Sequence, residues 1–273
     1  MKIRRVSDAP GRTRTSDQQL RRLLLYPPEL RAPIRARKSA VNLETPRTRR
    51  KPGTATAMSR LVFVTGGTGY MGQRLIAALL GRGHDVRALV RGAGARKLPE
   101  GTAAIHGDAL DHTTYDTHVA PADTFVHLVG ISHPSPAKAP LFRSVDLASV
   151  REALTAATGA AVEHFVYVSV AQPAPIMQSY VQARADAELL IRQSGLNATI
   201  LRPWYVLGPG HWWPVGLLPA YWVAALLPPT RDSARRLGLV TLGSMMRTLV
   251  AAIEDPAQGL RILGVPQIRR GRL

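Results

Sequence analysis

The sequence predicts one doubly wound α/β domain, a parallel β-sheet with helices on both faces, over residues 58–273. Short apolar runs alternate with segments of helical period, and a glycine-rich turn joins the first run to the first helix. The runs are almost continuously apolar, which is typical of strands buried on both faces of a parallel sheet. The expected strands are residues 61–65, 85–90, 102–106, 124–129, 164–170 and 198–202.

Helices are expected between these strands. Residues 70–82 show a clear helical period, with Met71, Leu75 and Leu79 on one face. Two more helices are expected before residue 200, and a helix and a short strand follow later. These elements are residues 145–158, 180–193, 242–253 and 260–263. The part after the sixth strand is short, so we expect residues 203–273 to form a small substrate-covering region of the same domain.

Charge is distributed unevenly along the chain, whose net charge is +18. Residues 1–57 hold 15 basic and 4 acidic side chains, whereas residues 58–273 hold 21 basic and 14 acidic ones. The predicted domain is therefore only modestly basic, and we expect no specific nucleic-acid partner. Cysteine is absent, which excludes disulfide frameworks, thiolate nucleophiles and Cys-ligated metal centres and fits a reducing compartment such as the cytoplasm.

The basic segment 1–57 lacks the periodicity and the apolar length needed to build a core, so we expect it to be a disordered leader. It shows no signal-peptide hydrophobic region. An organellar transit peptide, or a basic tail that contacts nucleic acid or an anionic membrane, would explain its composition. We favour a translation start placed too early, because the stretch resembles peptides read across a transfer-RNA gene and Met58 immediately precedes the first strand.

The glycine-rich turn predicts a dinucleotide site. Glycines at 66, 69 and 72 follow a strand and open a helix, which is the context that such a site requires. They allow a tight turn, close approach of backbone N–H groups to a pyrophosphate, and close packing of helix on strand. The helix N-terminus then faces the diphosphate. A purely structural turn is the alternative. The expected cofactor-binding residues here are Gly66, Thr68, Gly69, Tyr70, Met71 and Gly72.

The end of the second strand indicates which nicotinamide cofactor binds. An NAD site would present an acidic residue there, but the sequence around Arg91 is basic and contains no acid up to Lys97. A guanidinium can bind a 2′-phosphate through two parallel hydrogen bonds. We therefore expect NADP, with NAD as the alternative if these arginines are only solvated surface residues.

With these features the chain resembles the short-chain dehydrogenase/reductase superfamily, and more closely its atypical branch, which includes NmrA-like regulators and the nucleotide-binding accessory subunit of respiratory complex I. The resemblance rests on the glycine turn, on His-Gly-Asp-Ala at 106–109, on the strand that ends in Ser169-Val170, and on Leu-Arg-Pro at 201–203. It implies a Rossmann-type sheet with the nucleotide at the carboxyl ends of the strands.

The resemblance also assigns nucleotide contacts outside the glycine turn. It places Asp108 and Ala109 against the adenine, Val129 and Gly130 along the nucleotide cleft, and Pro203 near the nicotinamide. For Asp108 a turn cap is the alternative.

The catalytic pattern of this superfamily is only partly present. Its enzymes use a Ser, a Tyr and a Lys four residues after the Tyr, and the corresponding residues here are Ser169, Tyr180 and Arg184. The i,i+4 spacing places Tyr180 and Arg184 one turn apart on one helical face. A cation there favours ionisation of a phenol, but a guanidinium cannot release a proton. The departure favours a non-catalytic role, in which Tyr180 packs on the helix and Ser169 only ends its strand.

An aromatic, uncharged stretch follows the sixth strand. Residues 203–230 contain all four tryptophans, Trp204, Trp212, Trp213 and Trp222, and no Lys, Arg, Asp or Glu. In the family that the chain resembles, this region covers the nicotinamide and forms the substrate site, which here would be apolar. Repeated prolines argue against a membrane span, whereas peripheral contact with a membrane surface is the second interpretation.

These observations favour an NAD(P)H-dependent oxidoreductase that acts on a small apolar carbonyl or quinone-like compound. The alternative is a non-catalytic NAD(P)-binding redox sensor or assembly protein. A sugar-nucleotide epimerase is disfavoured by the imperfect triad and the small C-terminal part. The eight histidines show no metal-binding spacing, and we expect no metal.

Overall fold

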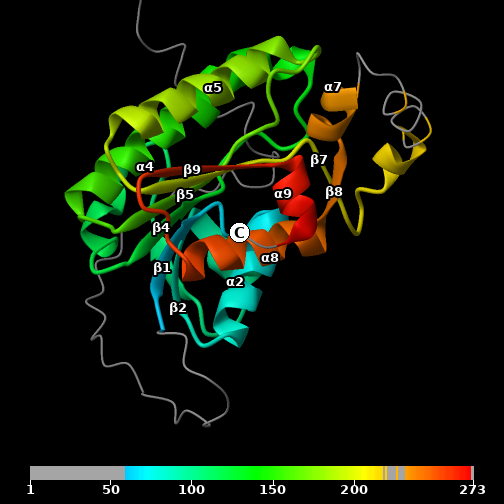
Figure 1. Cartoon of the computed structure of the whole chain (residues 1–273). Helices are drawn as coiled ribbons and strands as arrows, with labels where there is room; N and C mark the ends of the chain where they lie inside the picture. Colours follow the sequence, from blue (N-terminus) through cyan, green and yellow to red (C-terminus); the bar gives the residue numbers. More distant parts are fainter. Residues whose placement is uncertain (1–58, 218, 220–225, 227–230, 272–273) are drawn as a thin grey trace, which may run out of the picture. The chain divides into compact units, whose positions relative to one another are not determined.

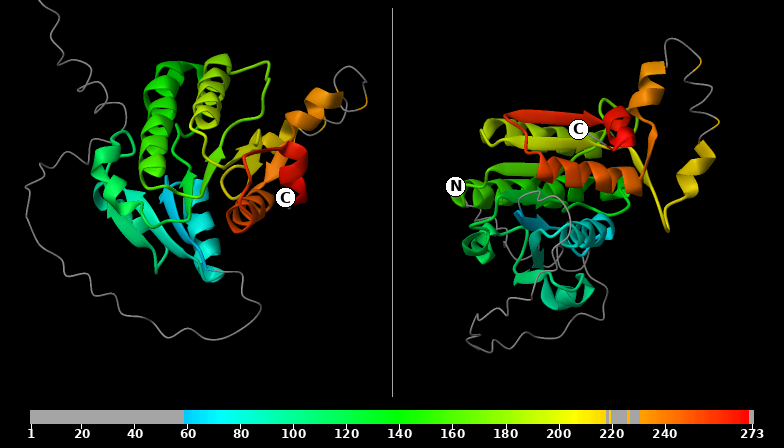
Figure 2. Two further views of the ribbon diagram at one scale, coloured as in Figure 1. Left: turned by 60° about the vertical axis from the view of Figure 1, so that its left-hand side comes forward. Right: turned by 60° about the horizontal axis from the view of Figure 1, so that its bottom comes forward.

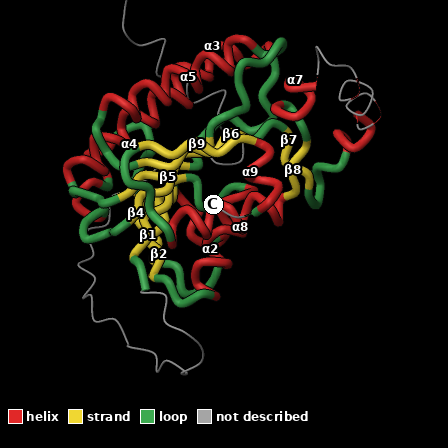
Figure 3. Tube along the Cα trace, viewed as in Figure 1, coloured by secondary structure: helices red, strands yellow, loops and turns green. Residues whose placement is uncertain are grey.

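The computed structural model describes residues 59–217, 219, 226 and 231–271. The expected leader, residues 1–57, lies outside this range, as do Tyr221 and Trp222. Seven parallel strands form one sheet in the order β3-β2-β1-β4-β5-β6-β9 (Figures 1 and 3). The strands are β1 Leu61–Thr65, β2 Asp85–Val90, β3 Ala103–His106, β4 Thr124–His127, β5 His164–Val168, β6 Ala198–Arg202 and β9 Leu260–Gly264.

Helices cover both faces of the sheet (Figure 2). Helices α2 (Tyr70–Gly81) and α8 (Leu242–Glu254) lie on one face. On the other face lie α4 (Ala148–Gly159) and α5 (Gln178–Gln193). None of the helices in the described ranges combines the length and apolarity that a membrane span needs.

The apolar strands supply both faces of the core. Val62 and Val64 pack under α2 and α8, whereas Phe63 between them packs on the side of α4 and α5. Phe63, Phe125 and Phe165 stand opposite one another on neighbouring strands, with ring centroids 5.1 and 5.4 Å apart. Such cross-strand pairs stabilise a sheet, and full burial of each phenylalanine contributes roughly 2–3 kcal/mol. Burial on two faces explains why the strands are apolar at nearly every position.

The predicted doubly wound parallel sheet is confirmed, with differences at element ends. The fourth and fifth strands stop at His127 and Val168, two residues earlier than expected, so the residues that follow them lie in loops. The helix expected from residue 145 begins as α4 at Ala148, and the π-helical segment Phe142–Leu147 leads into it.

Several short elements were not predicted, because a strand of three residues or a helix of three to six residues is too short to show its period. A two-stranded parallel sheet pairs β7 (Tyr205–Leu207) with β8 (Leu239–Thr241). The helices α3 (Ala139–Leu141), α7 (Arg231–Arg236) and α9 (Val265–Arg270) were also not predicted. Short 3-10 helices at Gly92–Lys97, His112–Thr114, Asp116–His118, Pro136–Lys138 and Trp213–Leu217 complete the described elements.

Candidate functional site

The turn between β1 and α2 has the close backbone packing expected of a dinucleotide site. Gly66 has a φ of +77°, and a Cβ there would lie 2.7 Å from the carbonyl carbon of Leu128 in the loop after β4. A Cβ on Gly72 would lie 2.7 Å from the Cα of Gly67 and still closer to the Gly66 carbonyl oxygen. The Gly69 N–H closes the turn by donating to that oxygen at 3.0 Å. Each glycine of the predicted triplet is thus at a position where the backbone approaches closely or turns.

The beginning of α2 can receive a phosphate. Its N-cap is Gly69, in extended conformation, and no side chain caps the helix. The first turn holds no acidic residue, so its N–H groups face the loop without competing negative charge. A side-chain-free cradle beside a helix N-terminus fits the diphosphate of a dinucleotide. Thr68, Tyr70 and Met71 are part of the same turn.

A basic segment lies beside this cradle. Arg91 follows β2 and opens the 3-10 helix Gly92–Lys97, whose last turn carries Arg96 and Lys97. A Cβ on Gly94 would be 3.5 Å from the Thr68 methyl group, which places this helix against the glycine turn. The structure therefore places the 3-10 helix that follows Arg91 against the glycine turn, and the predicted cofactor contact of Arg91 stays a prediction.

Asp108 and Ala109 follow the neighbouring strand, since β3 pairs with β2. The Asp108 carboxylate accepts a hydrogen bond from the Leu110 N–H at 3.0 Å, and its own N–H donates to the Thr114 hydroxyl at 2.9 Å. One carboxylate oxygen therefore caps a local turn, which is the alternative that the sequence left open. The predicted adenine contact of Asp108 and Ala109 stays a prediction.

Val129 and Gly130 lie in the loop after β4, and Gly130 faces side chains from α5 and from the π-helical segment. A Cβ on Gly130 would collide with the Arg184 guanidinium and lie 2.8 Å from the Asp146 carboxylate. Arg184 is 6% exposed and Asp146 is fully buried. The residue at 130 must therefore be small, because charged side chains from α5 and the π-helix fill the space beneath it.

Arg184 forms the centre of a buried network. Its Nη2 donates to Asp146 Oδ1 at 2.5 Å, and its Nη1 donates to the Tyr167 hydroxyl and to the Val168 carbonyl, both at 3.0 Å. The Ile131 N–H also donates to Asp146, at 3.2 Å. Burial raises the pKa of Asp146, and Arg184 and the Ile131 N–H oppose this rise. The guanidinium of Arg184 stays charged, because arginine does not deprotonate in proteins, and it is the favourable partner of this carboxylate.

Tyr180 lies against this network. The guanidinium carbon of Arg184 is 5.2 Å from the centroid of the Tyr180 ring, and Phe142 packs edge-on at 5.1 Å. The predicted proximity of Tyr180 and Arg184 is present. Burial raises the pKa of Tyr167 to about 12, so this second phenol stays protonated while it accepts from Arg184.

Ser169 is engaged in a second buried network. Its hydroxyl donates to Glu188 Oε1 at 2.6 Å, and the Gln172 amide donates to the same oxygen at 2.7 Å. Arg202 binds both carboxylate oxygens of Glu188, at 3.0 and 2.5 Å. In this arrangement the Ser169 oxygen can accept a hydrogen bond, but its proton is already committed to Glu188.

Two acidic residues of these networks were not predicted as part of the site. Glu188 follows Tyr180 and Arg184 at the same i+4 interval, so its place on their helical face could have been read from the spacing. Asp146 is 38 residues from its partner Arg184, and no local pattern connects them.

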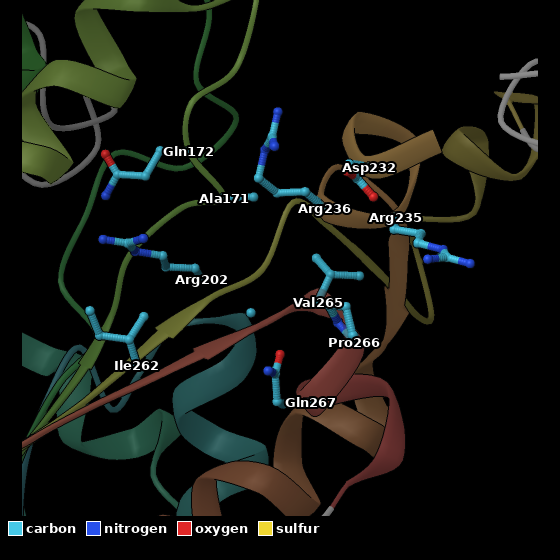
Figure 4. Close-up of a pocket in the computed structure, with 11 residues that line it drawn as sticks. Ala171, Gln172, Arg202, Asp232, Arg235, Arg236, Ile262, Val265, Pro266 and Gln267 are labelled. Carbon is cyan, nitrogen blue, oxygen red and sulfur yellow. The ribbon is translucent and has the colours of Figure 1, made fainter. Parts of the chain in front are cut away.

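The region after β6 was expected to form an apolar substrate pocket, and this expectation stays a prediction. Pro203 is buried, and its carbonyl accepts from the Ala171 N–H at 2.8 Å. Trp204 packs on the core, whereas Trp212 is 58% exposed. A hollow of about 380 Å³ opens at the ends of β6 and β9, between α7 and α9, with Gln172, Arg202 and Gln267 among its walls (Figure 4). No described tryptophan lines it.

Comparison with known proteins agrees with this geometry. A family model described as NAD(P)H-binding matches residues 66–208. The chain is similar to a ceramide reductase from Caulobacter vibrioides, with 27% identity over 210 residues that cover 76% of this chain and 65% of that protein. It is also similar to 4-hydroxy-2-methyl-3-oxo-4-farnesyl-3,4-dihydroquinoline-1-oxide ketoreductase from Stigmatella aurantiaca, with 29% identity over 168 residues, 54% of this chain and 50% of that protein. The chain thus spans about two thirds of the length of the first relative and about half of the length of the second.

A solved structure supports the fold. The crystal structure of a short-chain dehydrogenase/reductase superfamily protein from Agrobacterium tumefaciens with bound NAD superposes with a TM-score of 0.55. The identity is 19%, and the match covers 75% of this chain and 77% of that one. The sheet order, the glycine cradle and the matched family model agree, and the chain belongs to the NAD(P)H-binding family.

Proposed function

We propose that the protein is an NADPH-dependent reductase that converts the carbonyl group of an apolar compound to an alcohol. The observation that carries this proposal is the cradle of Gly66, Gly69 and Gly72, which leaves backbone N–H groups beside a helix N-terminus free of side chains. The names of the two similar proteins, both reductases, support the reaction class. Bound NADPH would supply the hydride for the reduction.

The choice of NADPH rests on the basic segment after β2. A 2′-phosphate needs cationic donors at this edge of the sheet, and Arg91, Arg96 and Lys97 lie there with no acid in the segment. Arg91 is the first of them and directly follows the strand.

Titration of the full chain with NADPH and NADH, followed by tryptophan fluorescence, tests this choice. We expect tighter binding of NADPH, and we expect Arg91→Ala to weaken NADPH about tenfold while NADH affinity changes little, because only NADPH carries the 2′-phosphate. Equal loss for both nucleotides would mean that Arg91 shapes the loop and does not select the cofactor.

Tyr180 is the proton donor in this proposal. Its ring lies against a fixed cation, 5.2 Å from the guanidinium carbon of Arg184, and its hydroxyl would donate a proton to the substrate oxygen as the hydride arrives. Arg184 cannot pass a proton onward, because a guanidinium does not deprotonate in proteins. The Ser169 oxygen can accept a hydrogen bond from a hydroxyl group of a bound ligand. It does not donate to that ligand, because its own proton is donated to Glu188.

Replacing Tyr180 by phenylalanine tests the assignment of the acid. We expect NADPH oxidation with aldehyde and quinone acceptors to slow at least about a hundredfold, while the NADPH dissociation constant stays within about twofold. Absorbance of the reduced nicotinamide at saturating NADPH measures the rate. Undiminished turnover in this variant would require a different proton donor.

An apolar substrate is supported by two features. The names of the two relatives refer to a ceramide and to a farnesyl compound, both with long hydrocarbon parts. The stretch 203–230 is uncharged and rich in tryptophan, and its Trp212 is exposed. Contact of this stretch with a membrane surface, from which such a substrate could be taken, stays a prediction.

A second candidate function is a cofactor-binding sensor or assembly protein. It is favoured by the internal use of Arg184 and Ser169, each of which donates a hydrogen bond to a buried carboxylate. Tight NADPH binding without oxidation of any acceptor would favour this candidate over the reductase.

A further inference from the structure

Two rings that are in contact beside the glycine turn each carry a buried polar atom without a hydrogen-bond partner. These atoms are the Tyr70 hydroxyl and Nδ1 of His211. The two rings are in contact, with centroids 4.5 Å apart. A buried polar group without a partner costs about 1–3 kcal/mol, and such groups are rare in folded proteins. Two such atoms on rings that are in contact indicate a ligand that completes their hydrogen bonding.

Separate elements hold these two side chains in place. Tyr70 is the first residue of α2, and its hydroxyl packs so tightly on Gly208 that a Cβ at that position would collide with it. His211 follows β7 in a short turn, and its N–H donates to the Gly208 carbonyl at 2.8 Å. Gly208 thus brings the two side chains together, and its lack of a Cβ leaves room for the phenol.

The other nitrogen of His211 fixes what Nδ1 can offer. His211 Nε2 lies 3.1 Å from Nε2 of His133, and one of the two must donate and the other accept. When His133 donates, the neutral His211 ring carries its proton on Nδ1. Nδ1 and the Tyr70 hydroxyl are then two unpaired hydrogen-bond donors on rings that are in contact.

The charges around the pair favour a negative partner. The guanidinium carbon of Arg74 lies 4.4 Å from the centroid of the Tyr70 ring, and Lys138 donates to the Ser132 and His133 carbonyls at 2.8 and 3.0 Å. Within the described part of the chain, no carboxylate forms an ion pair with Arg74, Lys138 or either histidine. The neighbourhood is therefore cationic.

We propose that Tyr70 and His211 form a binding site for an anionic or strongly accepting oxygen at the mouth of the glycine turn. Two sources provide such an oxygen: a diphosphate oxygen of the cofactor, or the carbonyl oxygen of the substrate, which becomes negative as it accepts hydride. The second source rests on the proposed reductase activity, whereas the first requires only cofactor binding.

Matched substitutions in the full chain test this site. Tyr70→Phe removes only the hydroxyl. His211→Gln keeps a polar group near the position of Nε2 and removes Nδ1, whereas His211→Asn keeps a polar group near Nδ1. Tyr115→Phe is the control, because Tyr115 also has a buried hydroxyl without a partner but lies in the core on the α4 side of the sheet.

The dissociation constants of NADPH and NADP⁺, and the rate of acceptor-dependent NADPH oxidation, are measured for each variant. If the bound oxygen belongs to the cofactor diphosphate, Tyr70→Phe and His211→Gln should bind both nucleotides about tenfold more weakly. The loss should be smaller in His211→Asn. If the bound oxygen belongs to the substrate carbonyl, Tyr70→Phe and His211→Gln should bind the nucleotides normally. Their kcat/KM for the acceptor should be about tenfold lower. In either case Tyr115→Phe binds and turns over like the unmodified protein.

The proposal is overturned if Tyr70→Phe and His211→Gln match the unmodified protein in both measurements, or in nucleotide binding when the protein oxidises no acceptor. A loss of similar size in Tyr115→Phe would also overturn it, because the effect would then follow from any lost hydroxyl. Failure of the unmodified protein to bind either nucleotide would instead contradict the proposed function itself.

Discussion

Replacing Gly72 by alanine is expected to weaken NADPH binding by at least about a hundredfold. The added methyl group would lie 2.7 Å from the Gly67 Cα and closer still to the Gly66 carbonyl oxygen. Both are backbone atoms, so the turn itself must move away from the helix. A diphosphate bound by backbone N–H groups loses several hydrogen bonds at once when the turn shifts by a fraction of an ångström. Fluorescence titration of the full chain with NADPH measures the loss.

Gly81 provides the matched control, because it belongs to the same helix and a Cβ there would meet nothing within 4 Å. Gly81→Ala should bind NADPH like the unmodified protein. Its free energy of unfolding should stay unchanged or rise by up to about 1 kcal/mol, since alanine is the better helix former. The site assignment fails if Gly72→Ala binds NADPH as tightly as Gly81→Ala does.

The contrast between these two glycines shows what the sequence could predict. The triplet at 66, 69 and 72 follows a strand and precedes a helix, so its function in the turn follows from local order alone. The strands were predictable for a similar reason, because burial on both faces leaves a continuous apolar run. Each of these features is determined by neighbours along the chain.

The buried networks could not be predicted in the same way. Asp146 lies in the π-helical segment that leads into α4, and there it is close to both Arg184 and Gly130. The His133–His211 contact joins loops 78 residues apart. Such contacts depend on how the sheet brings the strand ends together, and the sequence carries no local signal of them. The bonding of Arg184 was the least predictable, because its partner Asp146 is 38 residues away, whereas Ser169 donates to Glu188 on the next helix.

Replacing Asp146 by asparagine is expected to lower the free energy of unfolding by about 3–5 kcal/mol. The change is nearly isosteric, so the loss comes from charge and not from a cavity. Arg184 is 6% exposed and would stay buried without its counter-ion, which is the costly way to break a buried pair. Urea denaturation of the full chain at neutral pH measures the loss, with the m-value checked for constancy.

An exposed pair in the same region provides the comparison. Arg143 and Asp186 are 2.6 Å apart, but the Arg143 side chain is 69% exposed, so Asp186→Asn should cost less than about 1 kcal/mol. A double change of Asp146 to Leu and Arg184 to Met removes both charges and should cost less than Asp146→Asn alone, because no unpaired charge remains. A double variant that loses as much stability as the sum of its single changes would show that the two residues act independently. Arg184 would then not depend on Asp146 for its place beside Tyr180, and the fixed cation assigned to the proton donor would lose its structural basis.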